Sequence, residues 1–78
     1  MTIPISEIRE YAKKGDFAIS LREVENILKE NAMFLAHHPL DVLIFDFDRE
    51  LKRFCEYLQL DFVRDANLTV HFRKQKTQ

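Results

Sequence analysis

Few side chains in this sequence are of the types that perform catalysis or bind metals. The one thiol belongs to Cys55, and the imidazoles belong to His37, His38 and His71. Adjacent histidines on one helix point about 100° apart, so His37 and His38 do not form the chelating pair that an i, i+4 spacing gives. Cys55 follows Phe54 on an apolar helix side with no base beside it, which favours a buried thiol. We therefore expect no metal, no cofactor and no catalytic cysteine.

The segment 44–51, Ile-Phe-Asp-Phe-Asp-Arg-Glu-Leu, resembles the nucleophile motif of the haloacid-dehalogenase-like phosphatases. That family has small residues after its second aspartate, which let the backbone approach a phosphate, whereas Arg49 and Glu50 stand there in this chain. A chain of 78 residues is also too short for the sheet that such a site needs. We therefore expect Asp46 or Asp48 to cap the helix that follows. The protein is not expected to be an enzyme or to have a small-molecule substrate.

Length and composition indicate one small globular domain. Hydrophobic residues make up 46% of the 78 residues and charged residues 32%, a balance typical of folded proteins. One glycine and two prolines favour helices over a turn-rich all-β fold. We expect a single compact domain over 1–73 and a frayed tail over 74–78. Without a basic, apolar leader or a long apolar run, we expect a cytoplasmic protein that does not insert into a membrane.

Two helices are predicted in the N-terminal half. The first covers about 4–14, and the connector 16–19 that follows it could be extended. The second begins with a capping box, in which the Ser20 hydroxyl accepts the Glu23 amide and the Glu23 carboxylate reaches back to the Ser20 amide. Its apolar spacing continues to near residue 37, because a following proline stops it.

The segment 39–47 permits two interpretations. Its continuous apolar run, Val42–Phe45, would be buried on both faces as a strand. Apolar residues between 40 and 58 also recur at alternating spacings of four and three, so one helix over 39–59 is the alternative. Because Val, Ile and Phe cluster in the first half, we favour a short strand over 42–47 and a helix over 48–58.

Alternating apolar and polar residues predict a C-terminal β-hairpin, with strands near 58–63 and 68–73 around a turn at 64–67. The predicted fold class is therefore α+β: two N-terminal helices, a short middle strand or helix, a helix near 48–58 and the hairpin. A helix followed by a terminal hairpin resembles the closing half of a winged-helix domain. This resemblance of element order implies nucleic-acid binding.

The charges are unevenly distributed along the chain. Residues 1–48 carry nine acids and five bases, a net charge of -4, and residues 49–78 carry seven bases and four acids, a net charge of +3. On a recognition-type helix, the three bases of 49–53 would face outward together, although acids are interleaved with them. The candidate nucleic-acid-binding residues are Arg49, Lys52, Arg53, Arg64, Arg73 and Lys74.

Seven phenylalanines are many for a core this small. All seven can share one core, or Phe34 (beside Met33), Phe45 and Phe47 form an exposed patch of the kind that binds proteins. The favoured function is a small non-enzymatic intracellular binding module, an adaptor, inhibitor or regulatory subunit, acting through Phe34, Phe45 and Phe47. Its partner would be another protein or a second copy in a homodimer. The alternative is a winged-helix-like nucleic-acid-binding regulator.

Overall fold

The computed structural model describes residues 2–36 and 38–75, with the backbone alone at 41 and 42. Within these residues the chain forms four α-helices, one 3₁₀ helix and a three-stranded antiparallel sheet, which confirms the predicted α+β fold class. The elements in chain order are α1 (Ile5–Lys14), β1 (Phe17–Ser20), α2 (Leu21–Glu30), α3 (Ala32–Leu35), η1 (Pro39–Leu43), α4 (Phe47–Leu58), β2 (Leu60–Arg64) and β3 (Thr69–Lys74).

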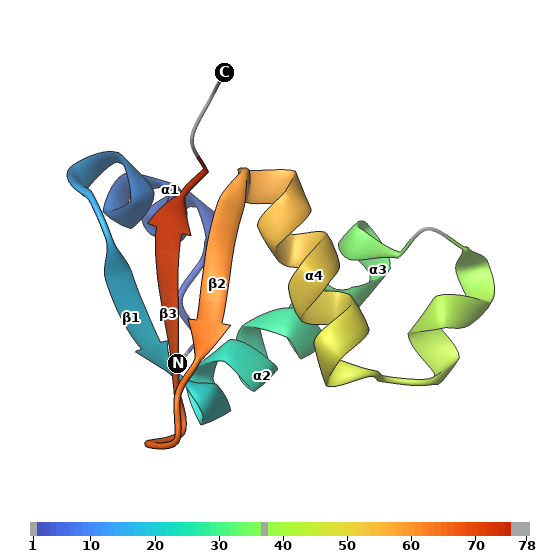
Figure 1. Cartoon of the computed structure of the whole chain (residues 1–78). Coiled ribbons are helices and arrows are strands. Elements are labelled where there is room, and N and C mark those ends of the chain that lie inside the picture. Colours follow the sequence, from blue (N-terminus) through green and yellow to red (C-terminus); the bar gives the residue numbers. More distant parts are fainter. Residues whose placement is uncertain (1, 37, 76–78) are drawn as a thin grey trace.

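The sheet joins the N-terminal half of the chain to the C-terminal hairpin. Its strand order is β1-β3-β2, so the last strand lies at the centre (Figure 1). Phe17, Phe72 and Phe62 lie side by side across the three strands, and the Phe17 and Phe72 rings stack with centroids 5.1 Å apart. The extended connector after α1 is thus a strand of the sheet. The order α1-β1-α2, then α4 and a hairpin, resembles that of winged-helix domains, in agreement with the predicted element order.

One face of the sheet packs against helices α1, α2 and α4 to form the core. The periodic apolar faces of these amphipathic helices supply one side of it, and alternate residues of the strands supply the other. Phe54 of α4 meets Phe72 of β3 edge to face, with centroids 6.3 Å apart. The buried core residues are Ile8, Ile19, Val24, Ile27, Leu28, Leu35, Leu51, Phe54, Cys55, Leu60, Val70 and Phe72.

The second helix is shorter than predicted. The Ser20 hydroxyl accepts the Glu23 amide (3.2 Å) as expected, whereas the Glu23 carboxylate accepts the amide of Ile3 (3.0 Å). Helix α2 ends at Glu30 because the Asn31 side chain donates to the Ile27 carbonyl (2.7 Å) and so competes with the helical backbone. The single turn α3 follows. The predicted end near residue 37 lies at the edge of the described residues.

The favoured strand over 42–47 is wrong, and the alternative of one helix over 39–59 is wrong as well. Pro39 begins the 3₁₀ helix η1 instead, and α4 begins at Phe47. The Asp46 carboxylate accepts the Arg49 amide (3.2 Å) and thereby sets the start of α4. The apolar run before it lies away from the sheet (Figure 1), so it has no strand to pair with.

The C-terminal hairpin is confirmed. Strand β3 reaches one residue into the segment 74–78, which was predicted as a tail, because Lys74 pairs with Leu60 across the sheet. The Gln75 amide then donates to the Gln59 carbonyl (3.1 Å). Residues 76–78 lie outside the described part of the chain. Gln59 itself adopts a left-handed conformation (φ 58°), which ends α4 and directs the chain into β2.

Candidate functional site

The largest group of exposed apolar side chains lies between residues 33 and 45, a segment that we call the arm. In the described residues nine large apolar side chains are exposed, and six of them belong to the arm. Their exposed fractions range from 37% for Phe45 to 83% for Met33. The six residues are Met33, Phe34, Leu40, Leu43, Ile44 and Phe45. Exposed apolar residues scattered singly are ordinary, but a cluster of them indicates an interaction surface.

The arm stands apart from the sheet, on the far side of α4 (Figure 1). We call the sheet with α1, α2 and α4 the body. The chain leaves the body after Leu35, which is 5% exposed, because Ala36 is extended (ψ 135°) and ends α3. It returns through Asp46, which is also extended and caps α4. Among the residues described between these two points, the regular element is the 3₁₀ helix η1, in which both Leu40 and Leu43 are exposed to solvent.

Contacts at both ends hold the arm against the helices. The Phe34 ring meets the Tyr57 ring of α4 edge to face, with centroids 4.9 Å apart. The Lys29 ammonium lies 5.4 Å from the centroid of the Phe45 ring, a cation–π contact. An Arg49 guanidinium nitrogen donates to the carbonyl of Ile44 at 2.7 Å. These contacts join the two ends of the arm to α2 and α4, while six of its apolar side chains remain in solvent.

The three phenylalanines predicted to bind a protein differ in exposure. Phe34 is 59% exposed and Phe45 37%, whereas Phe47 is half-buried on α4. The Phe45 and Phe47 rings are near neighbours, with centroids 6.5 Å apart. Leu43 and Ile44 were not predicted as site residues because the apolar run was assigned to a buried strand over 42–47, and Leu40, which lies before that strand, was not predicted either. The proline before the run and the capping aspartate after it were the signals for the observed conformation.

A shallow depression of about 310 Å³ lies at the base of the arm. Phe34, Leu35 and Ala36 form its arm side. On the α4 side it is bordered by Arg53, Glu56 and Tyr57. The lining of the depression therefore combines apolar and aromatic residues with one basic and one acidic residue.

The bases of α4 do not form an outward basic surface. Glu50 is 2% exposed, and its carboxylate accepts from the Arg49 Nε at 3.0 Å and lies 4.0 Å from an Arg53 guanidinium nitrogen. The side chains of Arg49 and Arg53 keep only 33% and 16% of their area exposed. Lys52 is exposed, but Glu56 follows it one turn later. The expectation that the three bases face outward together is therefore wrong.

The hairpin contributes little free positive charge near α4. Arg64 donates to the carboxylate of Asp48 at 2.6 Å and lies over the Phe47 ring at 5.0 Å. At the tip, the Asp65 carboxylate accepts the amides of Asn67 and Thr69 and contacts the His71 ring. The hydrogen bond with His71 is the main cause that lowers the pKa of the Asp65 carboxyl. The carboxylate of Asp65 thus holds the hairpin turn together and adds a negative charge at the tip.

The remaining two predicted bases lie on β3, where Arg73 shares the lining of a depression of about 370 Å³ with Lys52 of α4. Arg73 stands opposite Asp61 in the register of the hairpin. Lys74 lines a depression of about 460 Å³ together with Arg9 and Lys13 of α1. The structure therefore places Lys52 and Arg73 beside one depression, together with the acids Glu56 and Asp61, and Lys74 beside another that α1 also lines.

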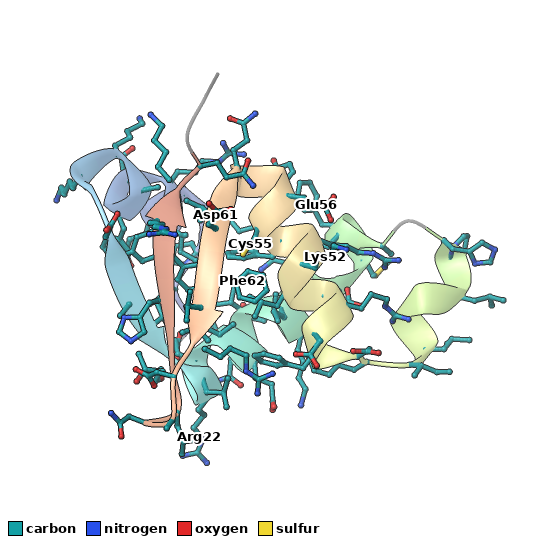
Figure 2. The ribbon with its side chains drawn as sticks, viewed as in Figure 1. Arg22, Lys52, Cys55, Glu56, Asp61 and Phe62 are labelled. Carbon is teal, nitrogen blue, oxygen red and sulfur yellow. The ribbon has the colours of Figure 1, made fainter. Side chains whose placement is uncertain are left out.

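Cys55 is buried between α4 and β2. Figure 2 shows it close to Lys52 and Glu56 of α4 and to Asp61 and Phe62 of β2, which line a depression of about 370 Å³ with it. Burial, and secondly the Asp61 carboxylate, raise the pKa of the Cys55 thiol to about 12. The thiol is 3% exposed and protonated at neutral pH, so it packs as a small apolar side chain.

The other residues with metal-ligand or phosphatase-like character have structural partners. Asp46 caps α4 and Asp48 pairs with Arg64. The His38 Nδ1 accepts the amide of Leu40 at 3.1 Å, and His37 lies outside the described residues. Over the part of the chain that the structure describes, no three His, Cys, Asp or Glu residues are grouped as a metal site.

Comparison with protein families, with curated proteins and with solved structures finds no match to this chain. None of the helices formed by residues 2–36 and 38–75 has the length and apolar character needed to cross a membrane. The geometry of the arm and the distribution of charge are therefore the observations on which a functional proposal rests.

Proposed function

We propose that this protein is a small non-enzymatic binding module, an adaptor, inhibitor or regulatory subunit, that associates with a protein chain through the arm. The observation that carries the proposal is the exposure of six large apolar side chains within 13 consecutive residues. Covering such surface is favourable by about 25 cal/mol per Å². A partner that covers the arm gains this free energy without unfolding or rearranging the body.

The charge distribution also supports a protein partner. On α4 the exposed residues alternate in sign, with Asp48, Lys52 and Glu56 at successive turns. Phosphate-binding surfaces gather unpaired bases, since affinity comes from neutralising several phosphates at once. Mixed charge around an apolar centre is instead the composition of a protein-binding rim.

Site-specific photo-cross-linking tests this proposal. A photoreactive amino acid is placed at Ile44 in the arm or at Leu68 in the hairpin turn, positions that are 70% and 69% exposed. In cells that produce the chain, we expect position 44 to form cross-linked adducts with protein and position 68 not to form them. Equal adducts from both positions, or none from position 44, would overturn it.

The second candidate is a winged-helix-like nucleic-acid-binding regulator, which the order of the elements favours. It is tested by fluorescence anisotropy with duplex DNA and single-stranded RNA at about 50 and about 200 mM salt. Binding that weakens steeply with salt, and weakens again in Lys52→Glu, would put this candidate first. Absence of binding at the lower salt concentration would remove it.

A further inference from the structure

The arm places exposed apolar side chains next to a shallow depression. Leu43 and Ile44 are 75% and 70% exposed at the projecting part of the arm, and the depression of about 310 Å³ lies at its base. A projection and a hollow on the same side of a molecule are the two halves of an isologous contact. A two-fold axis between two copies places each projection opposite the hollow of the other copy.

The exposed apolar area has the size that a dimer requires. Taking the six arm side chains as large apolar residues of about 150–250 Å² each, their exposed fractions amount to on the order of 700 Å². A standard protein interface buries about 800 Å² on each partner. The hollow is also at the lower end of the about 300–1,000 Å³ range of pockets that accept an anchoring group.

The charges of the arm favour a second copy over a charged partner. Residues 31–45 contain one acid, Asp41, and no lysine or arginine. Such a segment offers nothing to attract an acidic or a basic partner, and two identical segments meet with little repulsion. On α4 the hollow is bordered by one base, Arg53, which already faces Glu50, and by one exposed acid, Glu56. The net charge of -1 adds little long-range repulsion between copies.

We propose that two copies of this chain form a two-fold dimer through the arm, with the Leu43–Ile44 projection of each copy seated against Phe34, Ala36 and Tyr57 of the other. This inference rests on the proposed function and names its partner. The apolar projection is then the central anchor of the interface, and Arg53 and Glu56 are its polar rim.

Sedimentation velocity of the purified chain over a wide concentration range tests the dimer. We expect a concentration-dependent dimer in the native chain and a dissociation constant at least about 100-fold higher in Ile44→Asp, because each dimer then buries two carboxylates in apolar surroundings. Leu68→Asp is the matched control: Leu68 is equally exposed, and its left-handed backbone (φ 57°) accepts Asp. This control is expected to dimerise like the native chain.

A second variant tests the hollow separately. Ala36→Arg places a long, charged side chain at the floor of the hollow while leaving the projection intact, and it is also expected to abolish the dimer. Circular dichroism melting of each variant checks that the monomer stays folded. A native chain that is monomeric throughout, or a dimer that both variants retain, would overturn the inference. If the native chain is monomeric but position 44 still cross-links to other proteins, the dimer is excluded and the proposed function is retained.

Discussion

The arm is richer in apolar residues than the rest of the chain, with 9 in 13 residues against 27 in 65, and yet it is the less well covered of the two. Phe54 and Phe72 in the body are each 1% exposed, whereas Phe34 and Ile44 in the arm are 59% and 70% exposed. In the body, sheet and helices present their apolar faces to one another. The arm contains one turn of α-helix, which packs against α4 through Phe34, and a 3₁₀ helix that projects beyond α4 (Figure 1).

This difference shows that the apolar content of a segment does not by itself determine whether its side chains are buried. A side chain is buried in its own chain only when a second element can be placed against it. In the body the hairpin brings β3 between β1 and β2 and completes that second layer. Six apolar side chains of the arm remain exposed in the described chain, which is why the proposed function is located there.

The largest expected effect separates the two regions directly. Phe54→Ala leaves a cavity in the core and is expected to lower the free energy of unfolding by about 3–5 kcal/mol. Leu43→Ala removes an apolar group from the arm and is expected to change the free energy of unfolding by less than about 0.5 kcal/mol. Urea denaturation at a concentration where the chain is monomeric measures both. Similar losses in the two variants would contradict the distinction between body and arm.

The next effect concerns the buried carboxylate that links α4 to the arm. Glu50→Gln keeps the shape of the side chain but removes the charge that Arg49 and Arg53 face. We expect a loss of about 1–3 kcal/mol in the free energy of unfolding. Because Arg49 also donates to the Ile44 carbonyl, hydrogen exchange of the amides next to Ile44 should accelerate. Unchanged exchange there would show that the arm is held independently of Glu50.

A smaller effect is expected at the point where the arm ends and α4 begins. Asp46→Ala removes the side chain that accepts the Arg49 amide and should lower the free energy of unfolding by about 1 kcal/mol. Asp46→Asn is the matched control, since Asn caps helices about as well as Asp does. Chemical denaturation of the three proteins measures the difference. Equal losses in both variants would indicate that the negative charge, and not the cap, is what matters at this position.

The smallest effect is a pH dependence at the hairpin tip. The pKa of Asp65 is lowered in the folded chain, chiefly by its hydrogen bond with His71. The ionised carboxylate therefore stabilises the fold above its unfolded pKa, and this contribution is lost as the pH falls through the lower, folded pKa. In Asp65→Asn, denaturation midpoints should decrease less between about pH 7 and about pH 3 than in the native chain. The same decrease in both proteins would remove Asp65 as a source of acid sensitivity.

The candidate site was predictable only where local signals determine it. Phe34 and Phe45 were candidates because of the excess of phenylalanine. Leu43 and Ile44 were not candidates, because the apolar run that contains them is equally typical of a buried strand. The bases of α4 were placed on one helix side correctly by their spacing. The side chains of Arg49 and Arg53 turn to Glu50, because a carboxylate buried at 2% exposure requires partners, and spacing does not reveal that burial.

The sequence by itself determined the local structure of this protein: the cap at Ser20, the cap at Asp46, the amphipathic helices and the alternation of the hairpin. These features depend on contacts between residues a few positions apart. Only the tertiary structure decided that 17–20 is an edge strand paired with the last strand, that Glu50 is buried, and that the arm stays exposed. Those outcomes depend on which distant elements come into contact, and local periodicity contains no information about that choice.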